Sequence, residues 1–204
     1  MMKQLPKFFF DRPDVVQIAK ELLGILVITS IEGKNTGGRI VETEAYVGLV
    51  DKASHSFNGR RTPKNEHMYC SPATSYIYIC YGMHQMLNIV TNKKDIPDAI
   101  LIRAIEPVLG MDIMLARSGK TTFDHTLTKG PGNVGKALGL TKANSGKDLM
   151  KGEIKLYQDD ESNINTESIG ISKRIGVESA GADGLLPYRF YIRGNKFVSG
   201  RPVK

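Results

Sequence analysis

Residues 39–88 bring together carboxylates, a histidine, a basic loop and a cluster of tyrosines. Five of the eight tyrosines of the chain lie in this segment: Tyr46, Tyr69, Tyr76, Tyr78 and Tyr81. An enzyme that turns a nucleobase out of a duplex uses flat side chains to hold the base and charged groups to act on it. The composition of this segment therefore favours a site that handles a nucleobase.

Two carboxylates, Glu42 and Glu44, lie on a short apolar run together with Tyr46. If this run is a strand, its period of two places all three side chains on one face. A carboxylate held against an aromatic ring in a partly dry site has its ionised form disfavoured, so its pKa rises toward the range of a general base. Two glutamates on a solvated strand face are the more frequent arrangement, and this pattern taken alone clearly favours that interpretation.

Tyr76 and Tyr78 alternate on a second expected strand, and Tyr81 precedes Gly82 where that strand ends. Aromatic alternation usually reflects packing against a core, but buried tyrosines must also satisfy their hydroxyl groups. The alternative is a pocket that stacks a base between rings. Tyr81 at the turn then fills the gap that the base leaves in the duplex.

Positive charge occurs in two settings. The loop NGRRTPKN carries Arg60, Arg61 and Lys64, which form either a solvated face or contacts to phosphates. Arg103 interrupts the apolar run ILIRAI. Because charged side chains are rarely buried without a partner, we expect Arg103 either to pair with a nearby carboxylate or to lie at a sheet edge.

The elements that must position these side chains are predicted from hydrophobic periodicity and turn residues. We expect helices from near Pro13 to Gly24, at 110–117 and within 135–140, and a long loop at 48–74. Strands are expected at 25–31, 38–47, 75–81, 87–91, 99–105, 154–157, 173–177 and 189–192, with the turn residues EGKNTGG between the first two. Strands that mostly follow turns indicate one α+β domain over residues 1–204, with a curved, mostly antiparallel sheet surrounded by helices.

The 204 residues include 28 Lys and Arg against 21 Asp and Glu, a formal net charge of +7. This excess favours a polyanionic partner, although many proteins are mildly basic. No apolar run approaches the roughly 20 residues of a membrane span, so we expect a cytoplasmic protein. Cys70 and Cys80 are expected to be free thiols. Neither they nor the scattered histidines have metal-site spacing, so no metal and no cofactor are expected.

The motifs, taken in order, resemble the alkyladenine (3-methyladenine) DNA glycosylase family. They are RIVETEAYVG, HS, G-R-R-T-x-x-N, Y-x-Y-I-x-Y-G-M-x-x-x-x-N, ILIRAIEP, GPGNVGKALGL and RIGVESAG followed by PYRFYIRGNKFVSG. The resemblance covers nearly the whole chain and implies a single mixed α/β domain that works without a metal. Two stretches depart from the family pattern: GPGNVGKALGL lacks a KLCQ or KLCR run, and SPATSYIY lacks the usual glycine.

The resemblance implies a monofunctional enzyme that flips an alkylated or deaminated purine, of the 3-methyladenine or hypoxanthine type, out of damaged duplex DNA. Water then hydrolyses the N-glycosidic bond. It also implies a monomer that works at the nucleoid without an obligate protein partner. No lysine falls at a matched catalytic position, which argues against a Schiff-base lyase mechanism.

Roles follow from the resemblance, position by position. Glu44 corresponds to the general base, and Arg103 and His55 correspond to groups that hold the water and the flipped base. Tyr46 and Tyr78, with His55, match the side chains that sandwich the base, and Asn88 matches the one that crowds the 2-amino group of guanine. The DNA-contacting positions are Tyr81 as the intercalating wedge, Met83, Arg60, Arg61 and Lys64.

Two other functions fit parts of the pattern. A non-catalytic basic nucleic-acid-binding module explains the charge and the tyrosines but leaves Glu44 and Arg103 without a role. A carbohydrate hydrolase would use Glu42 and Glu44 as its carboxylate pair. On one strand, however, those two side chains lie close together instead of flanking a sugar.

Overall fold

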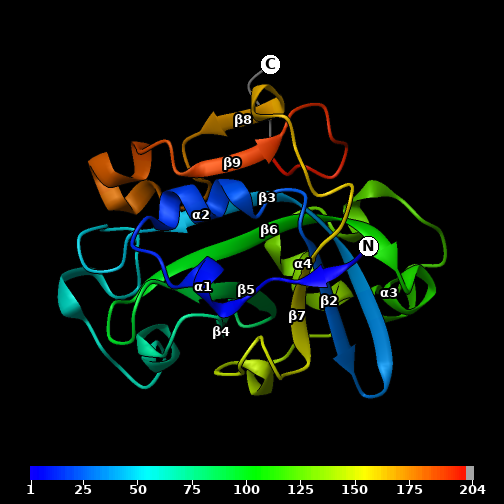
Figure 1. Ribbon diagram of the computed structural model, residues 1–204, viewed down its shortest axis with the longest axis horizontal. Coiled ribbons are helices and arrows are strands. Elements are labelled where there is room, and N and C mark those ends of the chain that lie inside the picture. Colours follow the sequence, from blue (N-terminus) through cyan, green and yellow to red (C-terminus); the bar gives the residue numbers. More distant parts are fainter. Residues whose placement is uncertain (201–204) are drawn as a thin grey trace.

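The sheet is antiparallel at every strand pair in the computed structural model, which describes residues 1–200 (Figure 1). Its order is β1-β7-β2-β3-β6-β5-β4, and β9 joins it at β3 and carries β8. The strands are β1 (Lys3–Gln4), β2 (Leu26–Ile31), β3 (Lys34–Tyr46), β4 (Thr74–Cys80), β5 (His84–Thr91), β6 (Asp98–Leu109), β7 (Ile154–Gln158), β8 (Ile169–Ser172) and β9 (Arg189–Ile192). The predicted α+β fold with a curved antiparallel sheet is confirmed.

Short helices surround this sheet (Figure 1). They are α1 (Lys7–Phe10), α2 (Val15–Glu21), α3 (Met111–Ser118) and α4 (Pro131–Ala137), with 3₁₀ turns at Phe57–Gly59, Glu66–Tyr69, His125–Leu127, Lys142–Asn144, Thr166–Ser168 and Glu178–Leu185. Asp14 caps α2 by accepting a hydrogen bond from the Gln17 amide, and the apolar face of α2 packs against β3. Within residues 1–200, no helix is both long and apolar enough to cross a membrane.

Two register shifts in the β3–β6 pair decide where the polar groups of these strands point. Ile40 pairs with Ile105, Glu42 with Ala104 and Thr43 with Ile102, so Val41 and Arg103 each fall outside the regular pairing. A bulge of this kind redirects side chains and is common beside active sites. Here Val41 packs in a small cluster with Ala104, while the Arg103 side chain turns toward the carboxylates of β3.

Three of the predicted elements are corrected. The β2–β3 turn is only residues 32–33, and residues 34–37 continue β3 because they pair with β2 and β6. Helix α4 begins at Pro131, before residue 135, because proline fits the first helical position. Residues 173–177 form no strand. Instead the Arg174 side chain and the Ile175 amide are bonded to Asp51 and Glu44, and the strand is β8 just before them. The short elements β1, α1 and β8 were not predicted.

The two-residue turn at Glu32 and Gly33 suggests a stabilising substitution. Both residues have positive φ (53° and 71°), as a type I′ hairpin turn requires. Glutamate is strained there, whereas asparagine tolerates this backbone conformation. We expect Glu32→Asn to raise the free energy of unfolding by about 1 kcal/mol, measured by urea denaturation. Glu32→Ala removes the same charge without the turn preference, so an equal gain in that variant would contradict this explanation.

Candidate active site

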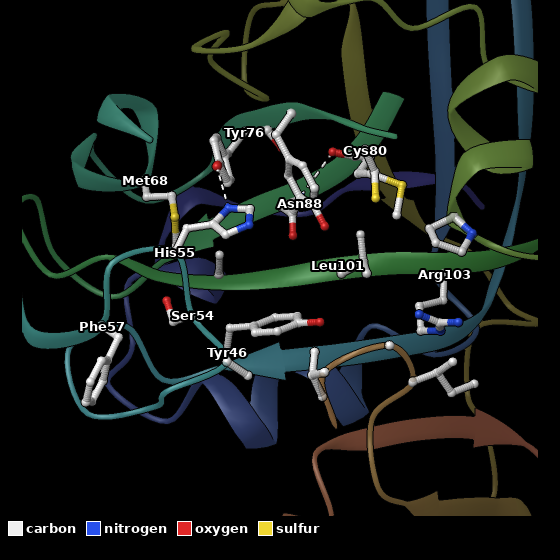
Figure 2. A pocket seen from close by; sticks show the side chains of 18 of the residues that line it. Tyr46, Ser54, His55, Phe57, Met68, Tyr76, Cys80, Asn88, Leu101 and Arg103 are labelled. Atoms are coloured by element: carbon white, nitrogen blue, oxygen red, sulfur yellow. Dashed lines mark hydrogen bonds between the residues drawn. The ribbon is translucent and has the colours of Figure 1, made fainter. Parts of the chain in front are cut away.

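A cavity of about 680 Å³ opens beside β3, β4, β5 and β6 (Figure 2). It brings together seven residues from separate parts of the chain: Tyr46, His55, Tyr76, Tyr78, Tyr81, Asn88 and Arg103. The strand pairing explains this convergence, because β3 and β5 flank β6 and β4 lies beyond β5. The cavity also contacts the irregular segment that follows β8, through Ile175.

Glu44 does not line this cavity itself but is bonded to Tyr46, Arg103 and Ile175, which do, and it has no solvent-exposed surface (0%). Its Oε2 atom accepts a hydrogen bond from the Tyr46 hydroxyl at 2.8 Å, and its Oε1 atom accepts one from the Ile175 amide at 2.8 Å. The Arg103 Nη1 atom is 3.2 Å from Oε1. A carboxylate has about four acceptor positions, so these contacts leave one of them for a further donor such as water.

Burial and the groups bonded to Glu44 shift its pKa in opposite directions. Burial raises the pKa above its ordinary value, whereas the Arg103 charge and the hydrogen bonds from Ile175 and Tyr46 lower it. The net shift is upward. A carboxylate with a raised pKa holds a proton more readily, which suits a general base.

Arg103 is held between the two carboxylates of β3. Its Nε atom donates to Glu42 at 3.1 Å, its Nη1 atom faces Glu44, and its Nη2 atom donates to Ser199 Oγ at 3.1 Å. Glu42 also accepts from Arg189 Nε at 2.6 Å and from the Ser199 amide at 2.8 Å. Arg103 therefore pairs with carboxylates, as the first of its two interpretations predicted, and Glu42 anchors it.

The walls of the cavity are aromatic. The His55 ring lies 4.6 Å from the Tyr78 ring, edge to face, and its Nδ1 atom is 2.8 Å from the Tyr76 hydroxyl. Although one side of His55 faces solvent, the protein around the ring lowers its pKa by desolvation, so the neutral imidazole is favoured. Figure 2 shows Tyr46 projecting from β3 on the opposite side. Tyr46 and His55 both line the cavity, and we call the space between them the slot.

Asn88 lies on β5 beside this slot and is 3% exposed. Its amide nitrogen donates to the backbone carbonyls of Tyr76 at 3.3 Å and Met86 at 3.1 Å. These two bonds fix the side chain, which lines the cavity. A flat ring in the slot would therefore meet a rigid polar group at this point.

Two of the five predicted DNA-contacting residues, Tyr81 and Arg60, line this cavity, and Met83 lies next to Tyr81 in the same turn. Tyr81 and Met83 flank Gly82 in the turn between β4 and β5, and their exposed fractions are 88% and 71%. Tyr81 has a φ of 50°, which explains why the strand ends there. Arg60 is exposed and lines the cavity.

The three cations of the 58–65 loop are not equivalent. All three are exposed, but Arg61 is also paired with Glu66 and with Asp95. Arg61 would have to leave these partners before it could contact a phosphate. Because Arg61 is paired, the 58–65 loop presents less positive charge to a phosphate than its sequence indicates.

Several contacts at the site were not predicted from the sequence. They are the Ile175 amide on Glu44, Ser199 on Arg103 and Glu42, and the Arg174–Asp51 ion pair behind Tyr46. No local pattern marks them, because each joins segments far apart in the chain. Over residues 1–200, no group of three or more His, Cys, Asp or Glu side chains is placed to hold a metal ion.

Comparison with known proteins agrees with this geometry. Residues 8–196 match the family model described as methylpurine-DNA glycosylase. Three relatives carry the name "Putative 3-methyladenine DNA glycosylase". The chain is 41% identical to the one from Desulfitobacterium hafniense strain Y51, and the match covers 97% of this chain and 99% of the relative.

The second, from Clostridium perfringens strain 13, is 40% identical over 96% of this chain and 98% of its own length. The third, from Chlamydia felis strain Fe/C-56, is 44% identical over 94% and 97%. A family model that matches most of the chain, together with relatives of this identity over their full length, shows what kind of protein this is. The chain belongs to the methylpurine-DNA glycosylase family and is a DNA glycosylase, a hydrolase of N-glycosyl bonds.

Proposed function

We propose that this protein binds damaged duplex DNA, flips an alkylated or deaminated purine into the cavity and hydrolyses its N-glycosidic bond with a water molecule activated by Glu44. The observation that carries the proposal is the buried Glu44 carboxylate, held by Arg103, Tyr46 and the Ile175 amide, three residues that line the aromatic cavity. A nucleic-acid-binding module has no use for such a group.

We expect water to reach Glu44 from the cavity side. Glu44 itself has no exposed surface, but its three partners Tyr46, Arg103 and Ile175 all line the cavity. A water between them donates a proton to the open acceptor position of Glu44. Its oxygen then bonds to C1′ of the sugar while the C1′–N bond breaks, and the bonding electrons leave with the purine.

The negative charge of Glu44 has a second effect. As the glycosidic bond lengthens, positive charge develops on the sugar, and a fixed carboxylate in a dry site stabilises it more strongly than one in water. A cationic alkylated purine leaves as a neutral base and is a good leaving group without further activation. Hypoxanthine is neutral, so we expect it to leave more slowly.

The slot supports selection of the base by shape and polarity. Tyr46 lies on one side, His55 and Tyr78 on the other, and the rings of these walls stack on any purine. Asn88 is the rigid polar group beside the slot, and we propose that it crowds the 2-amino group of guanine. Intact adenine lacks that group, so its exclusion depends on the stronger glycosidic bond and on the cost of unpairing it.

Exposed residues beside the cavity support a role in opening the duplex. Tyr81 and Met83 are exposed in the turn that joins β4 and β5. This position fits an apolar wedge of the kind that minor-groove-binding proteins insert between base steps. Arg60 and Lys64 are exposed cations of the neighbouring loop and fit contacts to phosphates.

One experiment separates this function from its alternatives. A duplex with a single hypoxanthine is incubated with the protein, and an identical duplex with adenine serves as the control. Strand breaks that appear at the lesion only after alkali support a monofunctional glycosylase. Tight lesion binding without any breaks favours a binding module, and breaks without alkali contradict simple hydrolysis.

The wedge role of Tyr81 is tested by Tyr81→Ala. We expect weaker binding to the lesion duplex by a few kcal/mol at most, because the wedge offsets an unstacking cost of that size. Fluorescence anisotropy with labelled duplex measures the effect. Phe8→Ala is the matched control, since Phe8 is also an exposed aromatic (75%) but does not line the cavity. Wild-type binding and base release in Tyr81→Ala would remove Tyr81 from this role.

A further inference from the structure

Arg174 is a fully buried cation just behind the cavity, with 1% of its surface exposed. Its Nη2 atom donates to Asp51 Oδ1 at 2.8 Å and to the Asp183 carbonyl at 2.9 Å. Its Nη1 atom donates to the Ala45 carbonyl at 2.9 Å and also to Asp51 Oδ2. One guanidinium therefore joins β3, the loop after β3 and two segments near the C-terminal end of the chain.

Arg174 also supports Tyr46. The guanidinium carbon lies over the Tyr46 ring, 4.7 Å from its centroid. Tyr46 lines the cavity but Arg174 does not, so the guanidinium packs against the side of the ring that faces away from the cavity. A planar guanidinium stacks well on an aromatic face. The ring that forms one wall of the base slot is thus held from behind.

The neighbours of Arg174 extend this support to Glu44 and His55. The next residue, Ile175, donates its amide to Glu44, and the Ala45 carbonyl that Arg174 binds belongs to the residue after Glu44. Asp51 begins the segment that leads to His55, and its Oδ1 atom also accepts from the Ala53 amide at 3.0 Å. Both hydrogen-bond donors of Glu44 are therefore tied to Arg174: the guanidinium lies over the Tyr46 ring, and Ile175 is the next residue in the chain.

Stability alone does not account for this arrangement. Replacing a buried ion pair by apolar side chains of similar volume is often neutral or stabilising. In addition, Arg174 Nε is buried and has no hydrogen-bond partner within residues 1–200, which carries a desolvation cost. Unsatisfied buried groups are rare and call for an explanation.

We propose that Arg174, with Asp51, is a positioning residue that fixes the Tyr46 ring, the Ile175 amide and the His55 loop around Glu44. This inference rests on the proposed function of the same site. Arginine is required because its planar fork meets two backbone carbonyls, a carboxylate and a ring at once. Lysine keeps the charge opposite Asp51 but lacks this geometry.

The test compares Arg174→Lys with a matched control, Arg39→Lys. Arg39 forms a bidentate salt bridge with Asp159, with hydrogen bonds of 2.9 and 3.0 Å, and it does not line the cavity. Base release from a hypoxanthine duplex is measured with saturating enzyme below the unfolding temperature of every variant. We expect Arg174→Lys to slow this step by about tenfold to about 100-fold, with the half-saturating enzyme concentration changed by less than about threefold. Arg39→Lys should keep the wild-type rate.

Each outcome has a separate meaning. If wild type and Arg39→Lys release the base and Arg174→Lys releases it equally fast, Arg174 is only a structural residue and the inference fails. If wild type releases no base, the proposed function itself fails. Asp51→Asn covers the case in which Arg174→Lys does not fold, because asparagine keeps one acceptor for Arg174. Slower base release in Asp51→Asn supports the inference, and a wild-type rate overturns it.

Discussion

A Glu44→Gln variant is expected to bind a lesion duplex almost as tightly as wild type but to release the base about 10³-fold more slowly, because a positioned general base contributes about 10²- to 10⁴-fold. Glutamine has the shape of glutamate and still accepts a hydrogen bond from the Ile175 amide, so the slot is preserved. It cannot take a proton from water, and it has no charge to stabilise the developing sugar cation.

The measurement has two parts, with one control. Single-turnover base release gives the chemical step, and anisotropy with the same duplex gives the affinity. Glu167→Gln is the control, because Glu167 is exposed and does not line the cavity. It should leave both quantities unchanged. A Glu44→Gln variant that releases base at the wild-type rate would show that another group activates the water.

Arg103→Gln is expected to move the acid limb of the base-release rate to higher pH and to lower the rate at neutral pH. Glu44 acts only when ionised, so the rate falls as the pH falls through its pKa. The positive charge of Arg103 is the largest influence that opposes the upward shift of this pKa by burial. Removing that charge raises the pKa further, and more of Glu44 is protonated at any given pH.

The other groups that face Glu44 remain in this variant. They are Tyr46 and Glu42 on β3 and the Ile175 amide, and Glu42 keeps its bond to Arg189. Breaking a buried pair also costs about 3–5 kcal/mol of stability, so rates are compared only where the variant is folded. Arg39→Gln serves as the control for loss of an arginine elsewhere. An acid limb that stays in place or moves to lower pH would contradict the role of Arg103 in keeping Glu44 ionised.

Local patterns predicted much of the site. The strand period placed Glu42 and Glu44 on one face with Tyr46, and both carboxylates do contact Arg103 while the Tyr46 hydroxyl reaches Glu44. Such predictions succeed because the positions of side chains along a strand follow from its backbone geometry alone. The solvated-face interpretation of the two glutamates was wrong, since both are fully buried.

Contacts between segments far apart in the chain were not predicted from the sequence. The segment KRIGV resembles a strand, but Arg174 pairs with Asp51, which lies 123 positions earlier in the chain. Ser199 reaches Glu42 across 157 positions. The bulge at Arg103 likewise arises from the pairing of β3 with β6 and has no signal within either strand. Roles that depend on such contacts require the folded structure.

One alanine in the segment SPATSYIY has a strained backbone conformation. Within SPATSYIY, Ala73 has a φ of 63°, in the left-handed region that favours glycine. An L-residue pays roughly 1–2 kcal/mol for this conformation. Alanine therefore occupies a position before β4 whose backbone conformation favours glycine.

The most direct test measures the bases that the protein releases from methylated DNA. DNA treated with a methylating agent is incubated with wild type, with Glu44→Gln or with no protein, and the free bases are separated by chromatography. We expect 3-methyladenine to appear with wild type far above its spontaneous release, and Glu44→Gln to remain near the spontaneous level. Release by wild type that does not exceed the protein-free control, or equal release by Glu44→Gln, would contradict hydrolysis by a Glu44-activated water.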